Sequence, residues 1–160
     1  VSQAKEILNG FNGDILVLYA DTPFIKPETI NSIKEARKTA DLVVLGFDSK
    51  DPGRYGRIIA NGRHIRKIVE FKDASEAERE VTLCNSGVMA GPASLIISLI
   101  GQIKNENAAG EYYLTDCPSI LLNIGQAVDA KPVLQPCEAL SVNTPEQLQM
   151  VENEMRKLGY

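Results

Sequence analysis

The sequence of 160 residues has no tryptophan, a single histidine and only three cysteines, and no apolar run in it approaches the ~20 residues of a membrane span. The cysteines are not spaced as a metal-binding knuckle or a redox pair, so we expect reduced thiols in a cytoplasmic protein. The start of the chain lacks the layout of a signal peptide. With a formal net charge of −4, the chain is not expected to bind nucleic acid, and its composition predicts no membrane binding.

The sequence also lacks a glycine-rich phosphate-binding loop of either common kind. No candidate nucleophile stands beside a candidate base. The single histidine, His64, adjoins a predicted hairpin turn, where we expect it at the surface rather than in catalysis. A phosphate-binding enzyme with this composition would therefore have to gather its positive groups locally.

Hydrophobic residues make up 44% of the chain, which is enough for a single folded domain with a real core. Ile15–Tyr19 is apolar without a break and is typical of a strand buried on both faces. Pro23 ends any strand ladder, so Asp21 falls just past the carboxyl end of this predicted central strand. Open α/β sheets bind ligands at that edge, where a carboxylate can hold Mg²⁺. Alternatively, Asp21 only shapes the turn before Pro23.

The rest of the chain alternates predicted helices and strands. Pro27 begins a helix that ends near Ala40, and Leu42–Phe47 is a second apolar strand, so the first strands form a βαβ unit with parallel pairing. Asn61-Gly62 predicts a hairpin turn. The further predicted elements are helices at Ser2–Asn9, Asp73–Glu80 (capping box Asp73 and Glu76), Pro92–Ile103, 116–124 and from Pro145 (capped by Thr144 and Gln147), and strands at Arg57–Ala60, His64–Phe71, Leu83–Ala90 and Ala127–Leu134.

Polar residues and glycines beside the predicted strand ends form a short list of candidate site residues. Each also has an ordinary explanation: Gly56 fits a bend, Glu70 a solvated strand carboxylate, and Asn85-Ser86-Gly87 a β-bulge. The candidates are Asp21, Gly56, Glu70, Asn85, Tyr113, Thr115 and Asn143.

Five motifs in these regions, followed by Val142-Asn143, resemble the bacterial N-acetylglucosamine-1-phosphate uridyltransferases. They occur in the family's order, at similar spacing, over nearly the whole chain. The resemblance is to the pyrophosphorylase domain of the bifunctional enzyme that makes UDP-N-acetylglucosamine for cell-wall precursors. The motifs are LYADTP at 18–23, PGRYGRI at 52–58, IVEFKDA at 68–74, NSGV at 85–88 and GEYYLTD at 110–116.

The resemblance implies UTP and N-acetylglucosamine 1-phosphate as substrates and Mg²⁺ as cofactor. Oxygen ligands such as a carboxylate and an amide carbonyl suit a hard cation, and sugar hydroxyls suit neutral and acidic groups. The implied residues are Asp21 and Asn143 for Mg²⁺, with Asn143 also at the substrate, Gly56, Glu70, Asn85, Tyr113 and Thr115 for the amino sugar, and Tyr19 and Ala20 near the nucleotide.

The sequence departs from the family pattern in two ways. Ala20 stands where the family usually has glycine. The family's opening glycine-rich loop, of the type L-x-A-G-x-G-T-R-M, and its acetyltransferase domain are not in this sequence. The resemblance therefore implies that residues 1–160 are a partial, N-terminally truncated nucleotidyltransferase domain. We expect such a fragment to be inactive alone and to expose an apolar sheet edge that favours self-association.

The fold predicted from these observations is an α/β, three-layer, Rossmann-like nucleotidyltransferase domain with a mostly parallel sheet and a β-hairpin insertion. The predicted activity is transfer of uridylyl from UTP to N-acetylglucosamine 1-phosphate. The alternatives are transfer to another hexose 1-phosphate and a non-catalytic sugar-phosphate-binding module. We expect Asp21 and Asn143 to converge at the sheet edge, and Gly56, Glu70 and Asn85 to line one pocket beside Tyr113.

Overall fold

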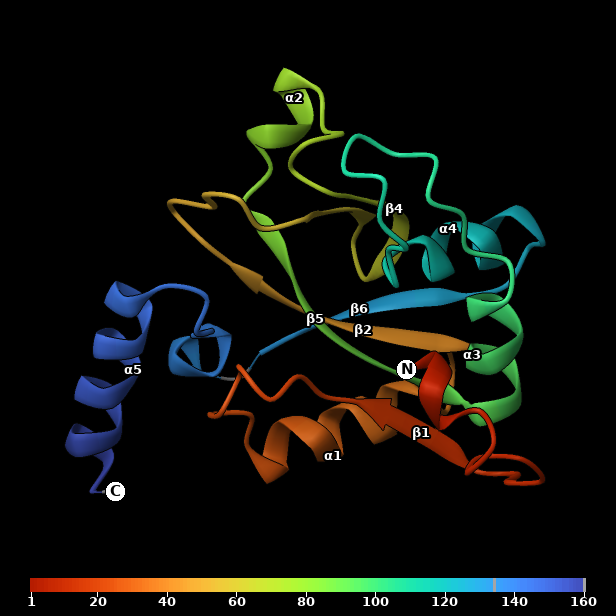
Figure 1. Ribbon diagram of the computed structural model, residues 1–160, viewed down its shortest axis with the longest axis horizontal. Coiled ribbons are helices and arrows are strands. Elements are labelled where there is room, and N and C mark those ends of the chain that lie inside the picture. Colours follow the sequence, from red (N-terminus) through yellow and green to blue (C-terminus); the bar gives the residue numbers. More distant parts are fainter. Residues whose placement is uncertain (134, 160) are drawn as a thin grey trace.

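The computed structural model describes residues 1–133 and 135–159. The described residues form one six-stranded sheet with helices on both faces (Figure 1). The strands are β1 Asp14–Val17, β2 Leu42–Asp48, β3 Arg57–Asn61, β4 His64–Val69, β5 Leu83–Pro92 and β6 Val128–Pro132. The helices are α1 Pro27–Ala36, α2 Glu76–Arg79, α3 Ala93–Ile100, α4 Asp116–Asn123 and α5 Pro145–Leu158, with 3₁₀ turns η1 Ser2–Ala4 and η2 Pro136–Ala139.

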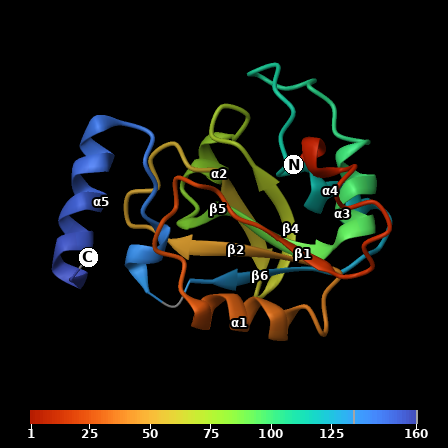
Figure 2. The same ribbon diagram turned by 60° about the horizontal axis from the view of Figure 1, so that its bottom comes forward.

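Strand β2 shows how the sheet is buried between two helical layers. Its residues from Leu42 to Phe47 are all buried, as the apolar run predicts. Leu42 and Val44 pack in the core cluster that includes α3 and α4, whereas Val43 and Leu45 pack in the cluster that includes Ile33 of α1. Because successive side chains of a strand point to opposite faces, this alternation makes a three-layer α/β/α fold. Figure 2 shows α1 beneath the sheet, and it shows α3 and α4 well apart from α1.

The sheet is mixed rather than mostly parallel. Its order is β1-β5-β2-β6-β4-β3, with β3 also meeting β5, and only the β2–β6 pairing of the described strands is parallel. The predicted parallel pairing of the first two strands is wrong, because β5 lies between β1 and β2 and runs antiparallel to both. The α/β class, the three layers and the β3–β4 hairpin insertion are confirmed.

Strand β1 is also shorter and less central than the sequence predicts. It ends at Val17, and among the described strands it pairs with β5 alone. Leu18 and Tyr19 lie beyond its end and are 47% and 41% exposed. The apolar run is therefore buried only in part, although Asp21 still follows the carboxyl end of the strand.

Several element boundaries differ from the predicted ones. In place of the predicted helix Ser2–Asn9, the chain forms the 3₁₀ turn η1 followed by hydrogen-bonded turns as far as Gly10. The box that caps α2 is Ser75 with Glu78, and the Asp73 carboxylate accepts the Ala108 N–H instead. Helix α5 begins at Pro145 with the predicted Thr144–Gln147 box, but only its Val151 is buried. In Figure 1 this helix stands at one side of the molecule. The predicted strand Ala127–Leu134 corresponds to β6, and its last residue lies outside the described residues.

The structure bears on two of the compositional expectations. All three cysteines are free thiols, and Cys84 and Cys117 are buried. None of the described helices combines the length and the apolar character that crossing a membrane requires.

Candidate active site

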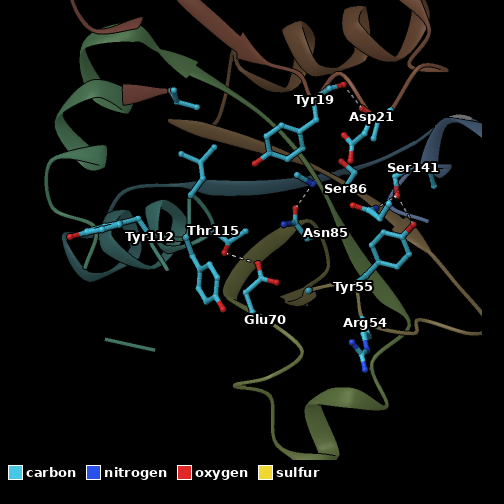
Figure 3. Close-up of a pocket in the computed structure, with 18 residues that line it drawn as sticks. Tyr19, Asp21, Arg54, Tyr55, Glu70, Asn85, Ser86, Tyr112, Thr115 and Ser141 are labelled. Atoms are coloured by element: carbon cyan, nitrogen blue, oxygen red, sulfur yellow. Dashed lines mark hydrogen bonds between the residues drawn. The ribbon is translucent and has the colours of Figure 1, made fainter. Parts of the chain in front are cut away.

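A cavity of about 550 Å³ lies beyond the end of β1, beside the middle of β5 and the end of β4. All the predicted site residues except Ala20 line it, although they come from distant parts of the sequence (Figure 3). Ala20 is exposed and is not among the lining residues. The predicted residues in the lining are Tyr19, Asp21, Gly56, Glu70, Asn85, Tyr113, Thr115 and Asn143.

A β-bulge turns the Asn85–Val88 motif toward this cavity. Val44 pairs with Met89 and Gly46 with Asn85, so β5 has extra residues opposite Leu45. Gly87 adopts a φ of +84°, which favours glycine, and a Cβ there would lie 2.1 Å from Cε2 of Tyr19. The Asn85 Oδ1 accepts the Gly87 N–H at 3.0 Å. The sequence left a β-bulge and a place in the site as alternative explanations of Asn85-Ser86-Gly87. In the structure both hold, because the bulge itself lines the cavity.

The carboxylate of Glu70 lines the cavity beside Gly56, Asn85 and Thr115, the residues for which the resemblance implies contact with the sugar. Thr115 donates its hydroxyl to Glu70 Oε1 at 2.9 Å, as the dashed line in Figure 3 shows. A Cβ on Gly56 would stand 3.3 Å from both Glu70 oxygens, and the Gly56 carbonyl accepts the Asn85 N–H at 2.8 Å. Gly56, Glu70 and Asn85 therefore line one cavity together with Tyr113, as predicted.

Asp21 and Asn143 both line the other side of the cavity. The Val142 N–H donates to the carbonyl of Asp21 at 3.0 Å, so the segment before α5 runs beside the loop that follows β1. Asn143 donates Nδ2 to the Ser141 hydroxyl at 3.3 Å, and that hydroxyl also lies 3.0 Å from the Tyr55 hydroxyl. Both predicted metal ligands line the cavity, and the close approach of their side-chain oxygens stays a prediction.

The charge of the cavity is mainly acidic. Asp21 and Glu70 face it, and Arg54 is the single lysine or arginine among the described lining residues. In Figure 3 the Arg54 guanidinium points away from Asp21. Burial, followed by the negative charges of Glu70 and Asp21, raises the pKa of Tyr19 above its ordinary value of 10.0. Its hydroxyl is therefore protonated at neutral pH and can donate a hydrogen bond to a ligand.

Sequence reasoning missed several lining residues. Tyr55, Ser86 and Gly87 stand inside the quoted motifs, so the motifs pointed to them without assigning a role. No pattern pointed to Ser141, which is buried and joins Tyr55 to Asn143 by hydrogen bonds. His64 lies outside the cavity lining, is exposed and contacts Asp129 at 2.7 Å, in agreement with the predicted surface position. The other missed lining residues are Thr22, Arg54, Tyr112 and Leu114, which also stand inside the quoted motifs, and Val1 and Ala139, which do not.

Comparison with solved structures defines the class of the fold. A UDP-glucose pyrophosphorylase complexed with UDP-glucose matches with a TM-score of 0.71 and 14% identity, covering 98% of this chain and 60% of that chain. A nucleoside-diphosphate-sugar pyrophosphorylase from Vibrio cholerae RC9 matches with a TM-score of 0.69 and 14% identity, covering 94% and 60%. CMP:2-keto-3-deoxy-manno-octonic acid synthetase matches with a TM-score of 0.65 and 16% identity, covering 98% and 67%. The fold is that of a sugar nucleotidyltransferase.

Comparison with characterised protein sequences shows which nucleotidyltransferases the chain is similar to in sequence. The bifunctional protein GlmU of Ruegeria sp. (strain TM1040) is 49% identical over 152 residues, which are 95% of this chain and 34% of that protein. The bifunctional protein GlmU of Jannaschia sp. (strain CCS1) is 46% identical over 156 residues, or 98% and 34%. The chain is similar to these GlmU proteins over nearly its whole length and spans about a third of theirs, which confirms the resemblance drawn from its motifs. No protein-family model matches the chain.

Proposed function

We propose that the protein carrying this chain transfers uridylyl from UTP to N-acetylglucosamine 1-phosphate and releases pyrophosphate. Residues 1–160 supply part of its nucleotidyltransferase domain. The observation that carries the proposal is the joint placement of Gly56, Glu70, Asn85 and Thr115 in one cavity of a chain similar to GlmU. One of the solved structures with this fold is a UDP-glucose pyrophosphorylase, but the identity of these structures to this chain is low and supports the fold alone.

The polar groups of this cavity suit an acetamido sugar. Glu70 receives the Thr115 hydroxyl at Oε1, which leaves Oε2 to accept hydrogen bonds from ring hydroxyls. Asn85 uses its Oδ1 to accept the Gly87 N–H, so its amide NH₂ can donate to the carbonyl of an N-acetyl group. Gly56, without a side chain, leaves room beside the Glu70 carboxylate. An acetamido sugar bound here would therefore find an acceptor for its ring hydroxyls at Glu70 and a donor for its N-acetyl carbonyl at Asn85.

Asp21 and Asn143 fit a divalent cation, and we propose Mg²⁺. Among the described residues, the Asp21 carboxylate has no hydrogen-bond or ion-pair partner, and no group of three His, Cys, Asp or Glu residues forms a separate metal site. Asn143 donates Nδ2 to Ser141, which leaves its Oδ1 as the free oxygen. One carboxylate and one amide oxygen are suited to Mg²⁺ bound largely through substrate phosphates. When bound, the cation would neutralise charge on those phosphates.

The proposed reaction is an in-line displacement at the α-phosphorus of UTP. A phosphate oxygen of the sugar phosphate forms the new bond, and the bond from the α-phosphorus to the bridging oxygen of pyrophosphate breaks. No residue of the chain is needed as a covalent nucleophile, so its contribution is to hold the sugar phosphate in the attacking position. In this account Glu70, Asn85 and Thr115 orient the sugar ring, and Tyr19 covers the bulge at Gly87.

The test is pyrophosphate release by the complete protein with UTP, Mg²⁺ and a series of sugar phosphates. We expect turnover with N-acetylglucosamine 1-phosphate. For glucose 1-phosphate and glucosamine 1-phosphate we expect a kcat/KM lower by up to about a hundredfold, because each lacks the acetamido carbonyl and would leave the Asn85 amide donor unpaired, at a cost of ~1–3 kcal/mol. Equal turnover of all three sugars would support the alternative of a general hexose 1-phosphate nucleotidyltransferase. Binding without any turnover would support a sugar-phosphate-binding module.

A further inference from the structure

Arg57 is a buried cation that the proposed reaction does not use. It is 2% exposed, and among the described residues it has no carboxylate partner. Its guanidinium donates instead to the backbone carbonyls of Gly53 at 3.1 Å, Arg79 at 3.3 Å and Tyr55. A buried charge is costly unless its donors are satisfied, so these carbonyls offset the loss of water. The fork of an arginine can hold several carbonyls at once because its N–H groups diverge in one plane.

The ring of Phe71 joins this arginine to a second one. The guanidinium carbons of Arg57 and Arg79 lie 5.8 and 4.6 Å from the centroid of that ring. Arg79 also donates Nε to the Phe71 carbonyl at 3.2 Å. The face of an aromatic ring attracts cations, and this attraction offsets the repulsion between the two guanidinium groups. The three side chains form one unit, which we call the arginine stack.

The arginine stack holds the two chain segments that carry the sugar side of the cavity. Arg57 fixes the carbonyl of Tyr55, which directly precedes Gly56, and Phe71 directly follows Glu70. Gly56 in turn accepts the Asn85 N–H at 2.8 Å and lies against the Glu70 carboxylate. None of the three stack residues lines the cavity. Any influence through packing therefore passes through the lining residues that adjoin the stack, Tyr55, Gly56 and Glu70, and through Asn85, which Gly56 holds.

We propose that Arg57, Phe71 and Arg79 are positioning residues that set the spacing between Gly56, Glu70 and Asn85. The identity of the sugar in this inference rests on the proposed function. The spacing of Gly56, Glu70 and Asn85 does not depend on it. The guanidinium fork is essential to it: lysine keeps the charge but presents one compact ammonium that cannot reach three separate carbonyls. Since Gly56, Glu70 and Asn85 lie on the sugar side and only Tyr55 reaches toward Ser141 and Asn143, the stack acts mainly on recognition of the sugar phosphate and much less on that of UTP.

The test compares Arg79→Met and Arg57→Lys with the wild type in the complete protein. Arg79 is half-buried, so its substitution should disturb folding less than that of the buried Arg57. The matched control is Arg37→Met: Arg37 is also half-buried and donates to the Ala40 carbonyl and to Asp14, but it does not line the cavity. Melting curves of each variant fix an assay temperature at which all are folded.

We expect both stack variants to raise KM for N-acetylglucosamine 1-phosphate about tenfold and KM for UTP less than about twofold, as loss of a positioning contact for one substrate requires. The Arg37→Met control should change neither. An equal rise for both substrates, or an unchanged KM for the sugar phosphate in Arg79→Met, would overturn the inference.

A second readout separates this inference from the proposed function. Hydrogen exchange of the Asn85 amide reports its bond to the Gly56 carbonyl without any substrate. We expect exchange about tenfold faster in Arg79→Met than in the wild type or Arg37→Met, since local opening becomes easier. Unchanged exchange refutes the positioning role. Faster exchange in a protein that does not turn over the sugar phosphate supports the stack while refuting the proposed function.

Discussion

At the scale of single residues, the proposed binding of the sugar phosphate depends first on Glu70. Replacing it by glutamine keeps an oxygen for the Thr115 hydroxyl but removes the charge and one acceptor. We expect KM for N-acetylglucosamine 1-phosphate to rise about tenfold or more, and KM for UTP to stay within about twofold, because a hydrogen bond to a charged group contributes ~1.5–3 kcal/mol. Steady-state kinetics of the complete protein measures both.

The matched control for Glu70 is Glu106→Gln, which removes an exposed carboxylate outside the cavity. It should leave both KM values unchanged. A Glu70→Gln variant that raises both KM values equally would mean that Glu70 does not contact the sugar.

Gly87 gives a second prediction at this scale. An alanine there would be strained by the φ of +84° and would also collide with the Tyr19 ring at 2.1 Å. Gly125 is the matched control, because its φ is +77° and nothing lies within 4 Å of an added Cβ. Left-handed strain alone costs ~1–2 kcal/mol, so we expect Gly125→Ala to lower the free energy of unfolding by about that amount and Gly87→Ala by more.

Urea unfolding of the two glycine variants checks this prediction. Equal losses of stability would mean that the Tyr19 ring moves aside freely and does not cover the bulge. A larger loss for Gly87→Ala, together with an altered Tyr19 environment in the spectrum of the folded protein, agrees with the contact that the structure shows.

At the scale of elements, the short helix α2 depends on its capping box. Hydrogen bonds from Lys67 and from the N–H and hydroxyl of Ser75 lower the pKa of Glu78 from 4.5 to about 2. Because the folded-state pKa is the lower one, the stabilising contribution is complete above pH 4.5 and is lost as the pH falls toward 2. We expect Glu78→Gln to destabilise the protein at neutral pH, and the difference from the wild type to shrink through that range.

Melting temperatures of the wild type and Glu78→Gln at a series of pH values give the measurement. Glu76→Gln is the control, since Glu76 lies on the same helix and does not belong to the capping box. A gap between wild type and Glu78→Gln that stays constant down to pH 3 would contradict the assigned role of this carboxylate.

The elements also show which parts of the fold can be predicted from sequence. Proline at the first helical position, the Thr144–Gln147 box and the Asn61-Gly62 turn depend on neighbouring residues and were located correctly. The pairing of the first two strands was not, because the strand between β1 and β2 is β5, which comes after the hairpin and α2. Pairing across such a distance leaves no local pattern. The same holds for the contact of Ser141 with Tyr55 and for that of Arg57 with the Arg79 carbonyl, which join residues 86 and 22 positions apart.

The candidate site was predicted better than the sheet because its residues stand in motifs. Physical reasoning alone left Asp21, Glu70 and Asn85 with ordinary explanations, and it was the order of the motifs that brought them together. The structure places all of them on one cavity. The bulge at Gly87 explains how an interrupted apolar strand can serve both the sheet and the site.

At the scale of the whole molecule, the charge of the cavity predicts the behaviour of the 160-residue chain by itself. A nucleoside triphosphate needs several cations and N–H groups around its phosphates, and Arg54 is the single basic side chain among the described lining residues. We expect no detectable pyrophosphate release from UTP and N-acetylglucosamine 1-phosphate by this chain alone. Full activity of the chain would reveal a phosphate site that the cavity does not show.

The most direct test of the whole account is a crystal structure of the complete protein with UDP-N-acetylglucosamine and Mg²⁺. We expect the acetamido sugar between Gly56, Glu70 and Asn85, with the Glu70 carboxylate accepting hydrogen bonds from ring hydroxyls. We also expect the cation between Asp21 and Asn143, with oxygen distances of about 2.1 Å. A sugar bound outside this cavity, or a cation held without Asp21, would contradict the account.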